Sequence, residues 1–444
     1  MVADGMSYGT LGLAESLIRQ RTGRSSNWAG LMLRDDVSRS LVDTRAANSM
    51  VTDSAAAATA WAIGELVDNG RIGLTPDGRM PTPILMHARQ AGRAIGLVTT
   101  TRITHATPAG FICNVPTTRD DENGIAEQMI ARAPDVMLGG GSRFVSDGLL
   151  AAAGFNGTLV RTGSELAAID PAAAIWPIVG LFAHSHMSYE IDRLNAPSGA
   201  DEPSLAAMTR VALATLGRAP GGFAVQIEGG RVDHGAHAND AGATIFDQVA
   251  FDEAIGVAWE FVQDRDDTLL IVTSDHSTAN PGLTEYGGRG NRGFELVHGF
   301  RHSFEWIDEQ LGTGMTLESN DSPQRRAAAA RSASFADIPA QRLREVVQAA
   351  AGIAITDDEI AMLHRWKRGE MVDPFMTNNV RYAPLSAVLA NHTGIAFLSP
   401  NHTADPVEFT AWGPGSELVP GVMAINHAHS LMVHALDLRP AKPL

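Results

Sequence analysis

Short apolar runs of the sequence end in side chains that could bind a metal ion. Asp4 follows one such run, Glu228 follows another, and the pair Asp275-His276 follows a third. Carboxylate oxygens and imidazole nitrogens are both good zinc ligands. Each of these residues alone could simply cap the next turn. Several apolar runs that end in such residues in one chain favour a metal site.

A second pattern lies just after Glu228. Asp233 and His237 are four residues apart, so a helical backbone would place them on one face. This spacing alone is typical of a solvated helix face. Because Glu228 precedes Asp233 by five residues at the predicted end of a strand, we interpret the segment as metal-binding.

One hydroxyl stands where a phosphoryl group could be stabilised. Ser54 follows Asp53 at the head of an alanine-rich run, which predicts a helix N-terminus. The N–H groups and the dipole of such a terminus favour an anion, although a simple N-cap would give the same pattern. No Gly-x-Ser-x-Gly motif surrounds Ser54 and no base adjoins it, so a nucleophilic Ser54 would need a metal ion as its activator.

These side chains need a framework that brings them together. Apolar runs with little alternation predict strands buried on both faces, at residues 94–99, 135–138, 178–182, 223–227 and 268–273. Helix-like segments lie between or before them, at 54–64, 124–132, 204–216 and 242–262. This alternation predicts an α/β fold with a mostly parallel sheet and helices on both faces. Functional groups collect at the carboxyl ends of such strands.

The segment from Pro281 to about Pro400 differs in character. Residues 287–293 are glycine-rich and predict a loop, and residues 325–331 are basic and rich in alanine. Thr356 and Glu359 have the spacing of a capping box before a helix. We interpret residues 285–395 as an insertion that covers part of the site, and 1–284 with 396–444 as the α/β catalytic core.

Bulk composition excludes some classes of protein. The formal net charge of −16 argues against nucleic acid as a specific ligand, which would require a basic face. No run of 18 apolar residues predicts a transmembrane helix, and the single Cys113 rules out an intrachain disulfide. The first residues show no signal peptide and look like the end of a buried strand, so we expect the natural chain to extend upstream of Met1.

The motifs together resemble those of the alkaline phosphatase family, in the same order along the chain. Asp4-Gly5-Met6 is similar to the family's first metal motif, Asp53-Ser54-Ala55 to its nucleophile motif, and His105-Ala106-Thr107-Pro108 to its magnesium motif. The segment from Glu228 to His237 and the pair Asp275-His276 are similar to its zinc motifs. The resemblance covers about residues 1–280 and 395–440. It implies a three-layer α/β/α sandwich with a large, mostly parallel central sheet and an inserted cap or crown-like region.

The resemblance also implies a set of functional residues besides the nucleophile Ser54. The implied ligands are Asp233, His237 and His402 for a first zinc, Asp4, Asp275 and His276 for a second zinc, Asp4, Thr107 and Glu228 for magnesium, and His105 and His234 in the outer shell. Arg119 is similar to the arginine that clamps phosphate in the family, a role that suits the two-pronged guanidinium.

The last zinc ligand requires a choice between two histidines. His392 and His402 each precede a threonine, as the family's histidine does. The strand-like stretch 407–412, followed by Gly413-Pro414, has the family's spacing from His402. We therefore expect His402 to be the ligand and keep His392 as the alternative.

The activity implied by the resemblance is hydrolysis of phosphate monoesters through a phosphoserine on Ser54, assisted by two zinc ions and one magnesium ion. The resemblance also implies small-molecule substrates, a homodimer, and a periplasmic or secreted location. The alternatives are a phosphodiesterase or sulfatase of the same superfamily, or a non-catalytic metal-binding homologue. Cys113-Asn114-Val115-Pro116 does not match the sulfatase motif, and related diesterases usually carry threonine where this chain has Ser54.

Overall fold

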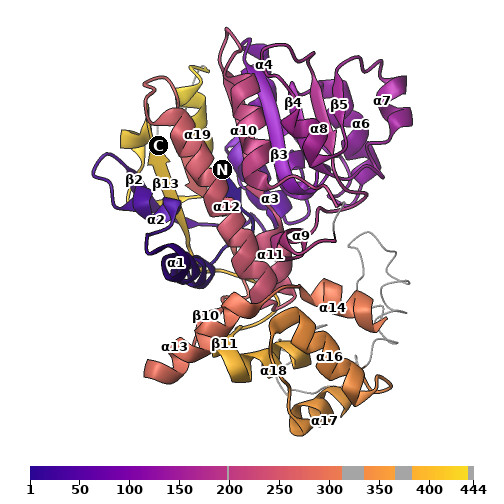
Figure 1. Ribbon diagram of the computed structural model, residues 1–444. Helices are drawn as coiled ribbons and strands as arrows, with labels where there is room; N and C mark the ends of the chain where they lie inside the picture. Colours follow the sequence, from indigo (N-terminus) through magenta and orange to yellow (C-terminus); the bar gives the residue numbers. More distant parts are fainter. Residues whose placement is uncertain (198–199, 313–334, 366–382, 439–444) are drawn as a thin grey trace.

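A ten-stranded sheet forms the centre of the structure, a computed structural model that describes all residues except 198–199, 313–334, 366–382 and 439–444 (Figure 1). From edge to edge its strands are β14 (Val422–Ala424), β2 (Ser38–Asp43), β13 (Val407–Trp412), β8 (Leu270–Thr273), β1 (Val2–Ala3), β7 (Phe223–Gly229), β3 (Ala94–Arg102), β4 (Val136–Gly140), β6 (Ile178–Leu181) and β5 (Thr158–Val160). Only β13 runs antiparallel to its neighbours in this sheet, so the predicted mostly parallel α/β sheet is confirmed.

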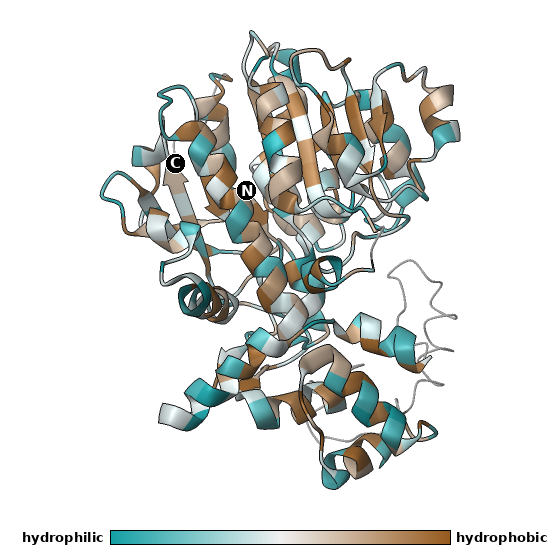
Figure 2. Cartoon of the chain, viewed as in Figure 1, coloured by the Kyte–Doolittle hydropathy of each residue, from teal (hydrophilic) through white to brown (hydrophobic). Residues whose placement is uncertain are grey.

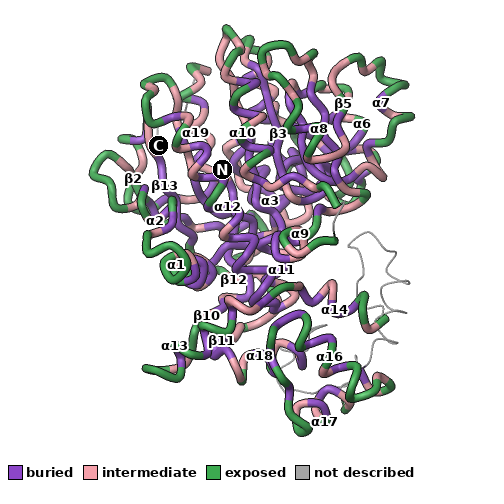
Figure 3. Tube along the Cα trace, viewed as in Figure 1, coloured by how far each residue is buried: buried purple, intermediate pink, exposed green. Residues whose placement is uncertain are grey.

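Helices cover both faces of the sheet. One apolar core contains side chains of α3 (Ser54–Ile63), α4 (Ile84–Gln90), α5 (Ala106–Ile112), α6 (Glu122–Arg132), α7 (Asp147–Ala152) and α19 (His427–Ala435). A second core contains side chains of α2 (Asn27–Met32), α8 (Gly163–Ala167), α10 (Leu205–Leu216), α11 (Arg231–His237) and α12 (Ala241–Val262). Figure 3 shows the sheet buried between these layers.

The strands lack polar alternation because both of their faces are covered. In β3, Ile95 and Leu97 belong to the first core, whereas Ala94 and Val98 belong to the second. Successive side chains of a strand point to opposite faces, so each core receives every other residue. Figure 2 shows the resulting concentration of hydrophobic residues along the central strands.

A third apolar core lies below the sheet in Figure 1. It contains side chains of α13 (Gly287–Glu295), η1 (Leu296–Gly299), α14 (Phe304–Leu311), α16 (Ala340–Ala351), α17 (Asp357–Arg365) and α18 (Ala383–Thr393), together with α1 (Tyr8–Thr22), α9 (Glu190–Leu194) and α12. The antiparallel pair β10 (Gly282–Leu283) and β11 (Ile395–Ala396) places the two ends of the segment 284–394 side by side.

The prediction of a loop at residues 287–293 is wrong, because this segment lies in helix α13. Phe294 is buried, and the backbone of α13 passes so close to α18 that a Cβ on Gly293 would lie 2.8 Å from the carbonyl oxygen of Thr393. Packing of this kind outweighs the poor helix propensity of glycine. Residues 325–331 lie outside the described part of the chain.

The predicted capping box before α17 is confirmed. The Glu359 N–H donates to Thr356 Oγ1 at 3.2 Å, and the Thr356 N–H donates to Glu359 Oε2 at 2.8 Å. The two side chains thus satisfy backbone donors at the start of the helix reciprocally.

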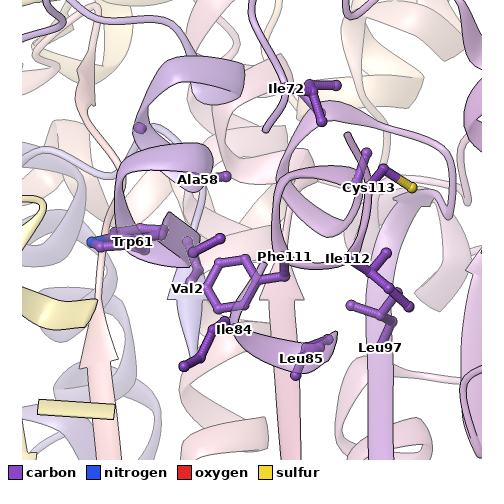
Figure 4. Packing of buried hydrophobic residues seen from close by; sticks show 14 of the residues in the cluster. Val2, Ala58, Trp61, Ile72, Ile84, Leu85, Leu97, Phe111, Ile112 and Cys113 are labelled. Carbon is purple, nitrogen blue, oxygen red and sulfur yellow. The ribbon is translucent and has the colours of Figure 1, made fainter. Parts of the chain in front are cut away.

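Tight packing of α3 against α5 fixes the helix that carries Ser54 (Figure 4). All ten residues of α3 are buried, and its alanines let α5 approach so closely that a Cβ on Gly110 would lie 2.7 Å from Ala58 Cβ. Trp61 and Phe111 pack with their ring centroids 6.1 Å apart. The alanine-rich sequence of α3 therefore serves close helix packing as well as helix propensity.

Within the described residues, no helix combines the length and the hydropathy needed to cross a bilayer.

Candidate metal centre and active site

Three neighbouring strands deliver carboxylates to one edge of the sheet. Val2 of β1 pairs with Glu228 of β7 on one side and with Thr273 of β8 on the other. Asp4 therefore emerges between Glu228 and Asp275, and all three carboxylates are fully buried. The carboxyl ends of parallel strands meet here, as the sequence predicts.

Gly5 makes this convergence possible. Its φ of +70° lies in the left-handed region, and a Cβ at this position would lie 2.5 Å from Asp233 Oδ1. The Gly5 N–H donates to Asp275 Oδ1 at 2.9 Å and so holds the two strand ends together.

The first cluster of metal-binding side chains lies beside the Ser54 hydroxyl. His276 Nε2 lies 3.2 Å from Asp275 Oδ2 and 3.6 Å from Asp4 Oδ1. Ser54 Oγ lies 3.2 Å from the same nitrogen, at the N-terminus of α3. The structure thus brings Asp4, Ser54, Asp275 and His276 together, although Asp4 and His276 are 272 positions apart in the sequence.

The second cluster forms where β9 (Ser277–Thr278) pairs with β12 (His402–Thr403). His402 Nε2 lies 3.7 Å from Asp233 Oδ1, and His237 Nε2 lies 3.3 Å from Asp233 Oδ2. His276 also belongs to this cluster, since it can offer a ligand atom close to those of Asp233 and His402. His392 lies elsewhere, 3.0 Å from Glu359 Oε1.

The hydrogen bonds of His237 and His402 leave two lone pairs facing each other. His237 Nδ1 donates to the Pro400 carbonyl at 2.5 Å, and His402 Nδ1 donates to the Thr52 carbonyl at 2.7 Å. In neutral imidazoles both Nε2 atoms are then unprotonated, yet they lie 2.9 Å apart. A cation between them removes this repulsion, so the pair fits a metal ion.

The third cluster joins Asp4, His105 and Glu228, whose ligand atoms lie within 4.8 Å of one another. Thr107 Oγ1 donates to Asp4 Oδ2 at 3.3 Å, and Thr99 Oγ1 donates to Glu228 Oε2 at 2.5 Å. Asp4 therefore belongs to two clusters. His105, expected in the outer shell, lies close enough to offer a ligand atom itself.

Four buried atoms in these clusters have no hydrogen-bond partner among the described residues. They are Asp4 Oδ1, Glu228 Oε1, Asp275 Oδ2 and His105 Nδ1. Buried polar atoms are normally paired, because an unpaired one costs about 1–3 kcal/mol. The three carboxylate oxygens are acceptors that converge without donors, which is what a cation requires, so Asp4, Glu228 and Asp275 fit bound metal ions.

The pKa values of the carboxyls also indicate that this site favours a bound positive charge. Burial raises the pKa of Asp275 to about 8 and that of Glu228 to about 7, and it raises the pKa of Asp4 well above its ordinary value. Burial acts in the same direction on Asp233, but His237 and His402 outweigh it and hold the pKa of Asp233 below its ordinary value.

Arg119 lies beside the serine helix. Its Nη1 donates to Asp53 Oδ2 at 3.1 Å, and its Nη2 lies 3.4 Å from His105 Nε2. Burial would lower the pKa of Arg119, but the negative charge of Asp53 raises it above its ordinary value. Arg119 therefore keeps its positive charge next to Ser54. The His234 ring packs edge to face against His105, with ring centroids 5.3 Å apart.

Sequence reasoning missed several side chains that contact the predicted residues, among them Thr278 and His186. Thr278 Oγ1 donates to Asp233 Oδ1 at 2.7 Å, and the His186 ring lies 4.4 Å from the His234 ring between centroids. Thr278 follows His276 by two residues, which is a usable signal. His186 lies in a loop without a recognisable motif.

Comparisons with known proteins agree with the geometry. The sequence profile of the family described as "Alkaline phosphatase" matches residues 1–438. The chain is 33% identical to the repressible alkaline phosphatase of Saccharomyces cerevisiae, over 62% of this chain and 54% of that protein's length. It is 34% identical to the streptomycin-6-phosphate phosphatase of Streptomyces griseus, over 60% of this chain and 72% of that protein.

A solved structure extends the likeness to the whole chain. The alkaline phosphatase of Thermus thermophilus is 34% identical and superposes with a TM-score of 0.86, over 100% of this chain and 91% of that one. Since the family profile and the fold both span nearly all residues, this chain belongs to the alkaline phosphatase family of phosphoric monoester hydrolases.

Proposed function

We propose that this chain hydrolyses phosphate monoesters by transferring the phosphoryl group to Ser54. One observation carries the proposal: Ser54 Oγ lies at a helix N-terminus, 3.2 Å from His276 Nε2 and beside clustered carboxylates. A phosphoryl group bound there would be stabilised by the positive end of the helix dipole and by cations held by those carboxylates.

The metal ligands follow from the clusters. Asp233, His237 and His402 would hold one zinc ion, Asp4, Asp275 and His276 a second, and Asp4, Thr107 and Glu228 a magnesium ion that His105 adjoins. When bound, such cations lower the pKa of a serine hydroxyl and stabilise the charge on a leaving oxygen.

The other side chains bind and orient the phosphoryl group. The Arg119 guanidinium can donate to two phosphate oxygens, and the free N–H groups at the start of α3 face the same anion. Ser54 loses its hydroxyl proton to water, and its Oγ forms a bond to phosphorus while the bond to the ester oxygen breaks; the leaving oxygen takes up a proton and departs as the alcohol. Water hydrolyses the phosphoserine in a second in-line step, which restores the Ser54 hydroxyl and gives net retention at phosphorus.

The decisive experiment replaces the nucleophile. Ser54→Ala should lower 4-nitrophenyl phosphate hydrolysis at least about 10³-fold, whereas Ser16→Ala on the exposed face of α1 should leave it unchanged. Mass spectrometry of acid-quenched wild-type enzyme should find phosphate on Ser54. Retention of the wild-type rate by Ser54→Ala would overturn the proposal. Faster cleavage of bis(4-nitrophenyl) phosphate or 4-nitrophenyl sulfate would instead favour a diesterase or a sulfatase.

We extend the proposal to assembly and location on the basis of the family resemblance alone. The chain is proposed to act as a homodimer in the periplasm or outside the cell, with residues 285–395 as an insertion that covers part of the site. Light scattering after size exclusion tests the dimer, because a monomeric mass at micromolar concentration contradicts it. Cell fractionation of the native host tests the location.

A further inference from the structure

Arg231 is a buried cation that joins three parts of the chain. It lies on α11, two residues before Asp233, and is only 4% exposed. Its Nη2 donates to Glu305 Oε2 at 2.6 Å, and its Nη1 lies 3.0 Å from His234 Nδ1. Its Cζ lies 3.7 Å from the centre of the Tyr189 ring.

The anionic partner of Arg231 comes from outside the sheet region. Glu305 lies in the first turn of α14, within residues 285–395, and α14 stands close to α11 in Figure 1. A buried guanidinium needs a paired carboxylate and hydrogen bonds to offset its lost hydration. Glu305 supplies the pairing, and the Tyr189 ring face adds a cation–π contact.

The contact with His234 fixes which ring nitrogen carries a proton. A guanidinium has donors only, so His234 Nδ1 must accept. The neutral His234 ring then carries its hydrogen on Nε2. His105, the next ring, has its buried Nδ1 without a hydrogen-bond partner among the described residues and belongs to the Asp4–Glu228 cluster. His234 packs edge to face against His105, so the orientation of His234 bears on that member of the third cluster.

We propose that Glu305 is a positioning residue of the active site, because it holds Arg231 where that guanidinium fixes His234 in its Nε2–H tautomer beside His105 of the third cluster. The inference rests on the proposed function and gives residues 285–395 a direct part in it. Replacement of residues that orient metal ligands, without touching substrate, typically changes metal affinity or activity by about 10- to 100-fold.

The test compares two glutamates of the same helix. Glu305→Gln removes the charge that holds Arg231, and Glu309→Gln changes an exposed side chain one turn further along α14. Magnesium chloride titrated into the zinc-loaded protein by calorimetry should bind about tenfold more weakly in Glu305→Gln and unchanged in Glu309→Gln. Long-range ¹H–¹⁵N spectra should show His234 Nδ1 unprotonated in the wild type and a changed tautomer ratio in Glu305→Gln.

A double variant separates positioning from mere stability. Arg231→Met with Glu305→Leu removes both charges, which commonly preserves folding. The proposal predicts that magnesium affinity stays low in this variant even where its unfolding temperature matches the wild type. Wild-type affinity in the double variant, or in Glu305→Gln, overturns the proposal, as does a protonated Nδ1 on His234 of the wild type. These readouts use no hydrolysis, so failure of the Ser54 experiment remains a separate outcome.

Discussion

At the scale of single residues, Asp53 links the serine helix to Arg119, the arginine that we propose binds phosphate. One of its oxygens caps α3 by accepting from the Ala56 N–H at 2.9 Å. The other accepts from the Gly70 N–H at 3.0 Å and from Arg119 Nη1 at 3.1 Å. Removal of this carboxylate therefore frees Arg119 as well as the helix end.

We predict that Asp53→Ala weakens substrate binding more than it weakens the fold. The lost cap costs about 1 kcal/mol of unfolding free energy. Loss of the anchor of Arg119 should raise KM for 4-nitrophenyl phosphate several-fold, because the guanidinium must then be ordered on binding. Ser204→Ala is the matched control, since Ser204 caps α10 through the Ala207 N–H. It should show the stability loss with KM unchanged, and equal KM values in the two variants would contradict the role assigned to Asp53.

The sequence predicts which residues form the site better than it predicts which of them lie together. Asp4, Glu228 and Asp275 follow predicted strands, so their convergence follows from a parallel sheet. The motifs could not reveal that His276 lies between two clusters, because its neighbour His402 arrives through the pairing of β9 with β12. Such pairing joins segments more than 120 residues apart and leaves no local pattern.

At the scale of elements, the central strands can be predicted from the sequence because both of their faces are buried. Helix α13 cannot be predicted in this way. Its glycines have low intrinsic helix propensity, and packing against α18 and η1 selects the helix. Local sequence carries no trace of that contact. The same reasoning explains α3, where an alanine run predicts a helix correctly because propensity and packing agree.

Two glycines of α13 offer a matched test of this explanation. A Cβ on Gly288 would meet only the end of the Arg292 side chain at 3.2 Å, whereas one on Gly293 would meet the carbonyl oxygens of Thr393 and His392 at 2.8 and 2.9 Å. Gly288→Ala should therefore stabilise the protein by about 0.5–1 kcal/mol through helix propensity. Gly293→Ala should destabilise it by about 1–3 kcal/mol through overpacking. Denaturant unfolding measures both, and stabilisation by Gly293→Ala would refute the packing argument.

At the scale of the whole molecule, the metal-binding clusters tie distant segments into one structure. Their ligands come from the end of β1, from the end of β7, from α11, from the segment after β8 and from β12, so they span the sequence from Asp4 to His402. Four of these side chains are buried carboxylates in a chain whose net charge is already −16. Bound cations should therefore contribute to folding as well as to chemistry.

Metal removal should make the stability of the protein depend on pH in a defined direction. Without cations, Asp275 and Glu228 have folded-state pKa values of about 8 and about 7, above their ordinary values of 3.8 and 4.5. The folded state then binds protons that the unfolded state has released, so stability falls as pH rises through this window. Cations replace those protons, so the metal-loaded protein should not share this loss.

The gap between the unfolding temperatures of loaded and chelated protein should consequently widen from pH 5 to pH 8. Differential scanning calorimetry with and without EDTA measures it. Asp275→Asn should flatten the slope of the chelated protein, because one titrating carboxyl is gone while the hydrogen bond from the Gly5 N–H can persist. Parallel pH profiles for loaded and chelated protein would mean that these carboxyls are not neutralised by bound cations, and the assignment of the metal centre would fail with them.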